Sequence, residues 1–262
     1  MKFDFLTMLS TYKTSLSKKS QLNSNTYLYH FDLIEPKEII FKPGQYVMLK
    51  VPSINGPVSR LYSIASPNNI KNSFELIVEI VPGGLASNYL FSLKENSEVT
   101  FQGPAGMFSL KENAKEKIFL VTGTGIAPIL SMIKSEFRIK NLELKINLFW
   151  GLKFYKDIYL LDELKQLATS VIPAPDRSRG QAPAGIQFKI CLSREQNLDM
   201  IPEENKKYFT LGHVDSCLNN ETIKQLNNYE YYLCGGRTAV ESLKQFLLAK
   251  KIPQENIIFE KF

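Results

Sequence analysis

The first 110 residues contain short segments in which apolar and polar positions alternate, separated by Pro and Gly. Residues 26–33 (TYLYHFDL) alternate in this way and are rich in aromatic side chains, which is typical of a half-buried strand. Residues 45–51, 61–65 and 74–81 show the same type of pattern. Short strands at this spacing, with few helical patterns between them, predict a small antiparallel barrel.

After a charged segment at 111–117, the pattern changes to short, continuous apolar strands that alternate with helical periodicity. The predicted strands are 118–121, 144–150, 188–192, 231–233 and 257–259, and the predicted helices are 129–137, 160–168 and 239–249. Strands that alternate with helices predict crossover connections and a parallel sheet covered on both faces. We therefore expect two domains of different architecture, residues 1–112 and 113–262.

One segment departs from both patterns. Residues 173–185 (PAPDRSRGQAPAG) are rich in Pro, Ala, Gly and Arg, whereas the rest of the chain is rich in Lys, Asn and Ile. We interpret this segment as a solvent-exposed insertion between a helix and the next strand. Its two arginines are able to contact an anion, but a solvated loop is the favoured interpretation.

Length and composition agree with two globular domains. The chain has 262 residues, of which 44% are hydrophobic and 22% are charged, and this composition excludes a disordered or fibrous protein. No apolar run approaches the ~18 residues of a membrane-spanning helix. Residues 1–10 lack the basic start and long apolar core of a signal peptide. The three cysteines form no C-x-x-C motif, so reduced thiols in the cytoplasm are expected, without structural zinc or an iron–sulfur cluster.

The net charge is +6, with 32 Lys and Arg against 26 Asp and Glu. This excess favours acidic partners and anionic ligands such as phosphates. A nucleic-acid-binding protein is a weak alternative, because no stripe of basic and aromatic residues supports it.

A glycine-containing loop follows the first apolar strand of the second half. It comprises Val121-Thr122-Gly123-Thr124-Gly125-Ile126-Ala127-Pro128. Two glycines allow close approach of a ligand to the backbone, and a helix start offers free N–H groups and the positive end of a dipole to a diphosphate. The third glycine of a G-x-G-x-x-G fingerprint is absent, because Pro128 occupies that position. The alternative is a tight strand-to-helix turn without a ligand.

Three further motifs lie in the first half. Arg60-Leu61-Tyr62-Ser63 combines a fork for phosphate oxygens, an aromatic ring for stacking and a hydroxyl, although it also fits an ordinary amphipathic strand. Residues 81–90 (VPGGLASNYL) are interpreted as a turn opening a short helix, whose amides could hold another phosphate. Residues 103–108 (GPAGMF) are interpreted as a loop that closes over a flat ligand.

Together these motifs resemble the ferredoxin–NAD(P)+ reductase superfamily, and the resemblance covers nearly the whole chain in order. The segments that carry it are Arg60–Ser63, Gly83–Ser87, Gly103–Phe108, Gly123–Pro128, Cys234-Gly235-Gly236 and Phe259-Glu260-Lys261-Phe262. The resemblance implies an N-terminal six-stranded antiparallel β-barrel that binds flavin and a C-terminal α/β parallel-sheet domain that binds a nicotinamide nucleotide. It further implies a stand-alone reductase with FAD and NADP as cofactors and without a fused iron–sulfur domain.

The resemblance also implies roles for individual residues. The expected flavin-binding residues are Arg60, Leu61, Tyr62, Ser63, Gly83, Gly84, Leu85, Ala86, Ser87 and Phe262. The expected NADP-binding residues are Thr122, Gly123, Thr124, Gly125, Lys153, Ser193, Arg194, Lys206, Tyr208, Cys234 and Gly235. The preference for NADPH rests on Ser, Arg, Lys and Tyr side chains between 193 and 208, where an enzyme specific for NADH more often carries an acid.

Four residues are implied to lie at the reacting rings. Ser63 is expected to hydrogen-bond near flavin N5, with Glu260 nearby, and Cys234 is expected beside the nicotinamide. Phe262 is expected to stack on the flavin face that the nicotinamide needs, and therefore to act as a gate. Taken alone, Cys234 is better explained as a small buried strand residue, and the alternative for Arg194 is a solvated surface arginine.

The implied function is transfer of a hydride from NADPH to FAD, followed by single-electron transfer to a ferredoxin or flavodoxin by a monomer. Two alternatives within the class are an oxygenase reductase and a cytochrome b5-type or free-flavin reductase. A third alternative, from a different class, is a non-catalytic electron-transfer subunit of a larger redox complex.

Overall fold

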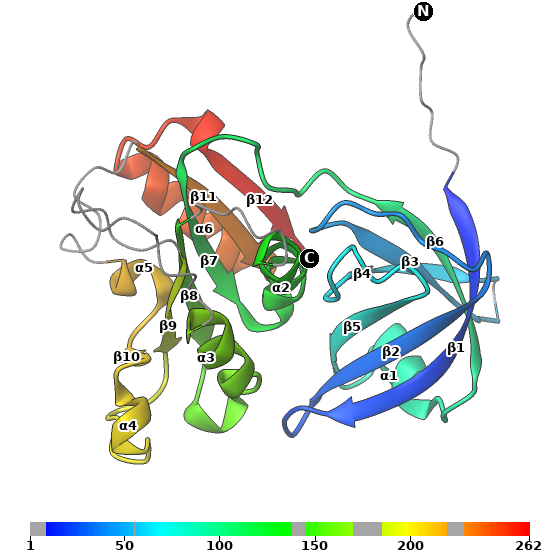
Figure 1. Cartoon of the computed structure of the whole chain (residues 1–262). Coiled ribbons are helices and arrows are strands. Elements are labelled where there is room, and N and C mark those ends of the chain that lie inside the picture. Colours follow the sequence, from blue (N-terminus) through cyan, green and yellow to red (C-terminus); the bar gives the residue numbers. More distant parts are fainter. Residues whose placement is uncertain (1–8, 55, 138–144, 170–184, 219–227) are drawn as a thin grey trace, which may run out of the picture. The chain divides into compact units, whose positions relative to one another are not determined.

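A computed structural model describes residues 9–54, 56–137, 145–169, 185–218 and 228–262 (Figure 1). It divides into two compact units. Unit 1 extends to Leu110 and also takes in Ala127–Ser135, and unit 2 comprises Lys111–Ile126 and Glu136–Phe262. The assignment of 1–112 and 113–262 as flavin and nucleotide domains stays a prediction. Nearly all of the insertion predicted at 173–185 lies outside the described residues; only Gly185 is described, as the first residue of a strand.

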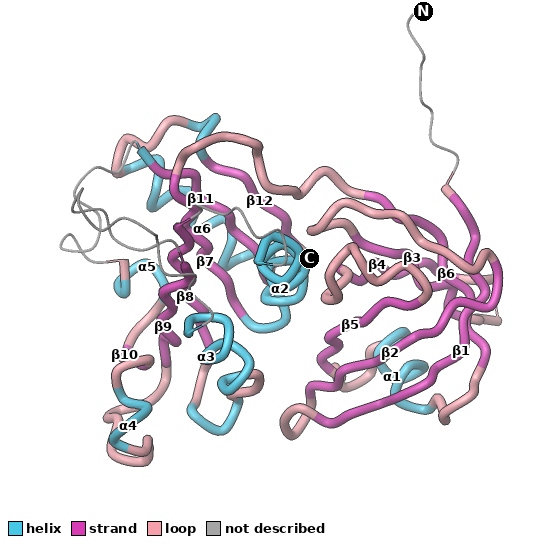
Figure 2. The backbone as a smooth tube through the Cα atoms, viewed as in Figure 1, coloured by secondary structure: helices cyan, strands magenta, loops and turns pink. Residues whose placement is uncertain are grey.

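Unit 1 is a six-stranded antiparallel sheet with the order β4-β3-β6-β1-β2-β5. Its elements are β1 (Ser10–Gln21), β2 (Thr26–Glu35), β3 (Tyr46–Val51), β4 (Val58–Ser63), β5 (Ser73–Glu79), α1 (Leu85–Ser92) and β6 (Glu98–Ala105). The two end strands approach each other through a bridge between Ile64 and Leu76 and a 2.8 Å hydrogen bond from Ala65 N to Glu75 O. The curled sheet therefore confirms the predicted barrel architecture, and Figure 2 shows how strands dominate this part of the chain.

Two strands of unit 1, β1 and β6, were not predicted from the pattern. In β1 every second residue from Tyr12 to Leu16 is buried, but the middle one is Thr14. The Thr14 hydroxyl donates a 2.9 Å hydrogen bond to the carbonyl of Val99 on β6, which makes its burial tolerable. A buried polar residue at the central position hides the apolar alternation on which strand prediction depends.

Aromatic rings fill the interior of unit 1. Phe31, Phe74 and Phe101 come from three different strands, and their ring centroids lie 4.9 to 5.7 Å apart. All three side chains are fully buried. Pairs at this distance add about 0.5–1.5 kcal/mol each beyond the area that they bury.

The middle of helix α2 (Ile126–Phe137) belongs to unit 1. The hydroxyl of Ser131 donates a 2.7 Å hydrogen bond to the carbonyl of Ser66, and the N–H of Asn68 donates a 3.1 Å bond to the Ser135 hydroxyl. Polar residues of the helix therefore satisfy backbone groups of the segment between β4 and β5.

Unit 2 is a six-stranded parallel sheet with the order β10-β9-β8-β7-β11-β12. Its strands are β7 (Glu116–Thr122), β8 (Lys145–Leu152), β9 (Gly185–Leu192), β10 (Phe209–Leu211), β11 (Tyr229–Gly235) and β12 (Ile257–Lys261). The predicted parallel sheet is confirmed. The chain moves outward from β7 to β10 and then returns to the other side of β7, so the order reverses between β7 and β11. In open α/β sheets such a reversal creates a crevice at the carboxyl ends of the strands.

Helices cover the sheet of unit 2. The described α-helices that lie wholly in unit 2 are α3 (Leu161–Thr169), α4 (Glu203–Lys206), α5 (Val214–Cys217) and α6 (Arg237–Ala249). Val240, Leu243 and Leu247 of α6 join one buried cluster with Ile118 of β7 and Leu233 of β11. No helix within the described ranges combines the length and the apolar character needed to cross a bilayer.

The predicted helices 160–168 and 239–249 agree with α3 and α6 within two residues at each end. The short elements α4, β10 and α5 were not predicted. The strand β10 has only three residues, Phe209–Leu211, and a segment of that length carries no usable periodicity.

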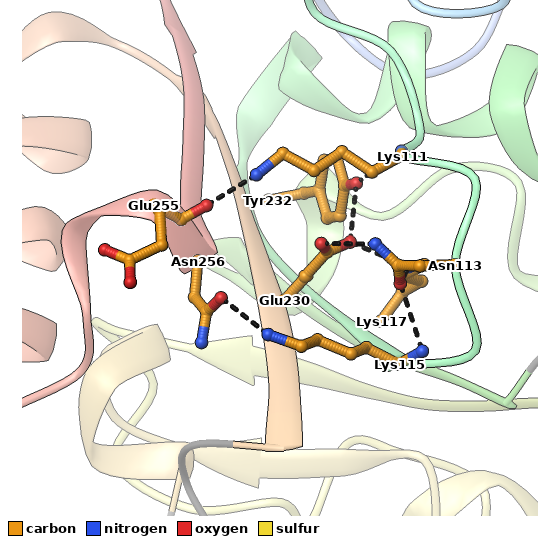
Figure 3. A network of polar contacts seen from close by, with 8 residues as sticks. All are labelled: Lys111, Asn113, Lys115, Lys117, Glu230, Tyr232, Glu255 and Asn256. Carbon is orange, nitrogen blue, oxygen red and sulfur yellow. Dashed lines mark hydrogen bonds and ion pairs between the residues drawn. The ribbon is translucent and has the colours of Figure 1, made fainter.

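A buried ion pair lies at the amino ends of β7 and β11, the edge opposite the predicted crevice (Figure 3). Lys117 Nζ lies 2.7 Å from Glu230 Oε2, and both side chains are at most 3% exposed. Asn113 donates to Glu230 (2.8 Å) and accepts from Lys117 (2.7 Å), and Tyr232 Oη donates to Glu230 (3.2 Å). The backbone N–H of Lys111 donates to Tyr232 Oη (2.9 Å). The network thus fastens the charged segment 111–117 to the sheet.

The carboxyl group of Glu230 is held ionised by this network. Burial raises the pKa of Glu230, but the hydrogen bonds from Lys117 and Asn113 and the charge of Lys117 outweigh burial, so its pKa lies below the ordinary value. A lowered pKa contributes stability above the unfolded-state value of ~4.3 that is lost as the pH falls through the folded-state pKa.

We predict that Lys117→Met lowers the free energy of unfolding of unit 2 by about 3–5 kcal/mol at pH 7, because it leaves a buried carboxylate without its counter-charge. The double variant Lys117→Met/Glu230→Leu should recover much of this loss, since no buried charge remains. The measurement is urea unfolding followed by the fluorescence of Trp150, the one tryptophan of the chain.

The matched control is Lys145→Met. It breaks the Lys145–Glu116 ion pair, in which both side chains are about one-third exposed, and should cost less than about 1 kcal/mol. The difference between Lys117→Met and the wild type should shrink below pH 4. Equal losses in Lys117→Met and Lys145→Met would show that the buried pair contributes no more than a surface pair.

Candidate functional site

The turn before α1 leaves open space beside its backbone. Gly83 has φ +73°, a conformation that favours glycine, and a Cβ at this position would meet nothing within 4 Å. The hydroxyl of Ser87 accepts a 3.1 Å hydrogen bond from the N–H of Val81 and lies 3.4 Å from the carbonyls of Val81 and Gly84. The Ser87 side chain therefore holds the turn closed, and the backbone remains to contact a ligand.

The start of α1 offers N–H donors without a competing negative charge. The N–H groups of Leu85, Ala86 and Ser87 belong to the first turn, where a helix supplies no carbonyl partner. The first turn contains no acidic residue, so the positive end of the helix dipole is not neutralised locally. This donor set fits a phosphate or diphosphate group.

The predicted flavin motif occupies β4, which hydrogen-bonds with β3 alone in the strand order. Ser63 lies opposite Tyr46, Tyr62 opposite Val47 and Arg60 opposite Leu49. The guanidinium of Arg60 is exposed and donates a 2.9 Å hydrogen bond to the carbonyl of Ser59. Since a guanidinium has five N–H donors, several remain for an anion.

The tyrosine and leucine of this motif differ in environment. Tyr62 packs partly buried against the core of unit 1, and burial raises its pKa to about 12, although the charge of Arg60 opposes the shift. The phenol is therefore neutral, and able to donate a hydrogen bond, throughout the physiological range. The Leu61 side chain is 55% exposed and presents an apolar surface.

Residues 103–108 differ from the loop that the sequence predicts. Gly103 to Ala105 complete strand β6, where Gly103 lies opposite Ser10 and Ala105 opposite Tyr46. Phe108 is 4% exposed and its carbonyl lies 1.9 Å from where a Cβ of Gly44 would be. Phe108 is therefore a core residue in this structure rather than the cover of a ligand.

In unit 2, the glycine loop packs tightly on the carboxyl end of β11. A Cβ on Gly125 would lie 2.4 Å from the carbonyl oxygen of Cys234, and one on Gly235 would lie 2.0 Å from Thr122 Oγ1. Gly125 and Gly235 are therefore required by the packing of the protein itself. Gly123 is different: it has φ +55°, and a Cβ there would meet nothing within 4 Å.

The loop Gly123–Gly125 is a 3₁₀ turn that continues directly into α2. The helix therefore begins at Ile126, three residues before the predicted start at 129, and Pro128 lies in its first turn, where proline is tolerated. Neither the 3₁₀ turn nor the first turn of α2 contains an acidic residue. With its open glycine at 123 and the N–H groups of Thr124 and Gly125, the loop fits a second phosphate group.

Two cationic residues continue the carboxyl edge next to this loop. Beyond β8 and β9 the parallel ladder extends, with Ser193 N donating to Leu152 O and Arg194 N donating to Lys153 O, both at 3.0 Å. The side chains of Lys153 and Arg194 are both exposed. The adjacent carboxylate, Glu195, accepts a 2.9 Å hydrogen bond from the backbone of Tyr155. The structure thus brings Lys153, Ser193 and Arg194 together.

Lys206 and Tyr208 are not brought to the same place. Tyr208 immediately precedes β10, so it lies beside Lys189 of β9, four residues or roughly 13 Å before Ser193. Its ring stacks on Phe188, with centroids 4.7 Å apart. Lys206 Nζ lies 2.7 Å from Glu203, and this partner raises the lysine pKa. The unpredicted strand β10 is the reason: it is parallel to β9 and begins opposite Ile190, so the residues just before it lie away from the carboxyl end of β9.

Cys234 is fully buried on β11, opposite Glu260 of β12. Burial raises the pKa of its thiol well above the ordinary value, and the negative charge of Glu260 adds to the effect. The thiol is therefore neutral at physiological pH and behaves as a small apolar group.

Phe262 is fixed through its backbone. Its N–H donates to Gly235 O (3.2 Å), and its carbonyl accepts from the N–H of Arg237 (3.1 Å), the first residue of α6. The ring itself is 58% exposed. Phe262 and Glu260 belong to unit 2, whereas Ser63 belongs to unit 1.

Two residues that the sequence analysis did not single out contact the glycine loop. Trp150 Nε1 donates a 2.9 Å hydrogen bond, and Tyr159 Oη a 3.2 Å hydrogen bond, to the carbonyl of Gly123. The sequence offers one signal for the first: the single tryptophan of the chain ends the strand predicted after the glycine loop. No comparable signal marks Tyr159. Within the described residues, no group of three His, Cys, Asp or Glu side chains is placed to hold a metal ion.

Comparison with family models gives two matches in the order of the two units. An oxidoreductase FAD-binding domain matches residues 13–110, and an oxidoreductase NAD-binding domain matches residues 119–177.

Curated relatives extend the match. The toluate 1,2-dioxygenase electron transfer component of Pseudomonas putida is 27% identical over 259 residues, covering 98% of this chain and 69% of the relative. Ferredoxin–NADP reductase B of Sorangium cellulosum is 34% identical over 165 residues, covering 63% of this chain and 62% of that protein. The chain therefore spans only part of the length of each.

Solved structures share the fold. The cytochrome P450 reductase GcoB of Amycolatopsis superposes with a TM-score of 0.81 at 24% identity, covering 97% of this chain and 70% of that one. A ferredoxin NADP+ reductase of Neisseria gonorrhoeae, with bound FAD and NADP, gives a TM-score of 0.75 at 18% identity and covers 97% and 98%.

The open space beside Gly83 and the N–H groups of the first turn of α1 together form a candidate phosphate site, which we call the first cradle; the corresponding site at Gly123 is the second. A substitution at Gly83 tests the first cradle. We predict that Gly83→Ala lowers the fraction of protein purified with FAD and raises the dissociation constant for added FAD about tenfold or more, because the new methyl group enters the cradle. The matched control is Gly56→Ala, which also has positive φ (+95°) and nothing within 4 Å, but lies in the segment between β3 and β4. If both variants lose FAD equally, backbone strain rather than the cradle explains the loss.

Proposed function

The chain belongs to the ferredoxin reductase-like family of flavin- and nicotinamide-dependent oxidoreductases, and on this premise we propose that it is a ferredoxin–NADP+ reductase. In this proposal the enzyme takes reducing equivalents from NADPH and delivers single electrons to a ferredoxin or flavodoxin. It acts as a monomer in the cytoplasm, with residues 1–112 as its FAD domain and 113–262 as its nucleotide domain.

One observation carries the proposal. Each unit contains a positive-φ glycine with open space beside it, Gly83 in unit 1 and Gly123 in unit 2, directly before a helix without acidic residues in its first turn. Both cofactors of the proposed reaction carry a diphosphate, and each cradle supplies backbone N–H donors for one such group. A binding module for a single nucleotide would need only one of them.

Bound FAD supplies the coupling between a two-electron donor and a one-electron acceptor. In this proposal the residues of the chain bind and orient the two cofactors. Arg60 offers charge to the FAD phosphates, Tyr62 offers a neutral ring for packing, and the first turn of α1 offers N–H groups to the diphosphate. Thr122 and the loop Gly123–Gly125 do the same for the nicotinamide nucleotide.

Four residues are proposed to act at the reacting rings. Ser63 donates a hydrogen bond, Glu260 lies in its vicinity, and Cys234 presents a neutral thiol beside the nicotinamide. The exposed ring of Phe262 covers the flavin until the nicotinamide replaces it. Removing Phe262 should therefore change both turnover and the selectivity between NADPH and NADH.

The choice of NADPH over NADH rests on positive charge at the carboxyl edge. The backbone N–H of Arg194 donates to the carbonyl of Lys153, so the two residues are neighbours there, and Ser193 adds a hydroxyl. Glu195, which directly follows Arg194, accepts a hydrogen bond from the backbone N–H of Tyr155. Lys206 and Tyr208 are left out of this proposal, because of where β10 places them.

The proposed electron acceptor follows from the net charge of the chain and from the curated relatives that it matches. The net charge of +6 favours association with an acidic electron carrier, as ferredoxins and flavodoxins are. A second candidate acceptor is an oxygenase component, because an electron transfer component of a toluate dioxygenase matches 98% of this chain.

The proposed function predicts that the purified protein shows flavin absorbance bands, and that these bleach on anaerobic addition of NADPH. Adding oxidised ferredoxin or flavodoxin should then restore them. A colourless protein that takes up no FAD contradicts the proposal. Bleaching without reoxidation by either carrier, but with reoxidation by an oxygenase component, favours the second acceptor.

The nucleotide preference is tested by Arg194→Ala. We predict that the ratio of kcat/KM for NADPH to that for NADH falls about 10- to 100-fold, since one charge-assisted contact to a phosphate is lost. Lys206→Ala is the control: its ammonium pairs with Glu203, so the ratio should stay within about twofold of the wild type. The reverse result would place the phosphate pocket at β10.

A further inference from the structure

The carbonyl of Gly123 accepts an unusual number of hydrogen bonds. Besides the N–H of Ile126, it accepts from the indole of Trp150 and the phenol of Tyr159. Trp150 lies within the central strand β8 and is fully buried, and Tyr159 lies before α3 and is 5% exposed. Two side chains from separate segments therefore converge on one backbone atom of the nucleotide loop.

The two rings also support each other. Their centroids lie 4.8 Å apart at an interplanar angle of 82°, which is the favourable edge-to-face arrangement. Each donor is thus held in place by packing as well as by its hydrogen bond.

The backbone next to Tyr159 is strained. Leu160 has φ +60°, which is a genuine outlier for a bulky side chain, and α3 begins at the next residue. Such strain persists only where surrounding structure compensates for it. Here the left-handed residue turns the chain into α3 directly after Tyr159 has reached the loop.

We propose that Trp150 and Tyr159 are positioning residues that hold the Gly123–Thr124 peptide with its N–H directed toward the diphosphate of the nicotinamide nucleotide. This inference rests on the proposed function and adds two residues to it. In a planar trans peptide the carbonyl and the N–H point in opposite directions. Fixing the carbonyl of Gly123 therefore fixes the N–H of Thr124 on the opposite side of the peptide, away from the two side-chain donors.

Glycine makes such a restraint necessary. A glycine populates positive and negative φ about equally, so an unrestrained Gly123 would lose much freedom when a ligand binds. A loop held in its binding conformation beforehand avoids that loss, and the gain is seen as affinity.

The test compares Tyr159→Phe with the wild-type holoenzyme, using NADP+ and NAD+ as probes in isothermal titration calorimetry and NADPH and NADH in steady-state kinetics. Tyr159→Phe keeps the ring and removes one hydrogen bond. We expect the dissociation constants of both oxidised nucleotides and the KM values of both reduced ones to rise about three- to tenfold. We expect kcat at saturation to be unchanged, because the interaction serves bound substrate and transition state alike.

The matched control is Tyr232→Phe. Like Tyr159→Phe, it removes the hydroxyl group of a buried tyrosine. The Tyr232 hydroxyl accepts from Lys111 N–H and donates to Glu230, at the opposite edge of the same sheet. It should lower thermal stability and leave both dissociation constants at the wild-type value. If Tyr159→Phe binds as tightly as the wild type, or if Tyr232→Phe loses as much affinity, the proposal is overturned.

A second measurement needs no variant. Since Trp150 is the only tryptophan, a ¹⁵N-labelled sample gives one indole cross-peak, and its shift reports the hydrogen bond to Gly123. Titration with NADP+ should leave this peak close to its position in the free protein, because the hydrogen bond is already formed before the nucleotide binds. A peak that moves to the position of a solvent-exposed indole at saturation shows that the bond breaks on binding and overturns the proposal. A wild-type protein that binds neither nucleotide in calorimetry instead contradicts the function on which it rests.

Discussion

The nucleotide side of this protein depends on one close approach between two segments of backbone. The loop after β7 touches the carboxyl end of β11 so closely that neither Gly125 nor Gly235 has room for a single additional carbon. This contact lies where the strand order of the parallel sheet reverses, which is the position at which such sheets generally bind ligands. With those two glycines committed to packing, Gly123 is the glycine of this loop that is left open to a ligand.

The two edges of the parallel sheet differ in the exposure of their charged side chains. At the amino edge, Lys117 and Glu230 are within hydrogen-bond distance of each other and of the Asn113 amide, and Glu230 also accepts from the Tyr232 phenol. At the carboxyl edge, Lys153 and Arg194 are exposed and face solvent. Complete neutralisation serves stability, whereas exposed positive charge is available to an anion. The same sheet thus has a buried, neutralised ion pair at one edge and exposed positive charge at the other.

Sequence patterns predicted the parts of this structure that depend on repeated local signals. Long apolar strands, the helix 239–249 and the order of glycine motifs all have counterparts, because periodicity and turn chemistry are local properties. The failures concern contacts between distant segments. Thr14 hides a strand because its partner is on β6; the three residues of β10 carry no period; and Tyr159 contacts a loop 36 residues earlier, which no local pattern encodes.

The candidate site divides along the same line. The glycines and the first turn of α1 could be placed from motifs, since a motif is itself a local constraint. The sequence did not predict whether the hydroxyl or ring of a motif residue faces a ligand. The Ser87 hydroxyl instead bonds within its own turn, and the Phe108 ring is buried in the core. Lys206 and Tyr208 are a second example. The short strand β10, which no local pattern predicts, places Tyr208 beside Lys189 rather than near Ser193 at the carboxyl end of β9.

The way in which Phe262 is attached limits how its ring can move. Hydrogen bonds on both sides of its peptide continue the ladder with β11, so the backbone there is as ordered as a strand. Displacement of the ring therefore requires only rotation about its side-chain torsions, which exposed residues complete in picoseconds to nanoseconds. Rotation on this time scale is far faster than a typical enzymatic turnover, so in the role proposed for Phe262 the movement of its ring would not be the slow step.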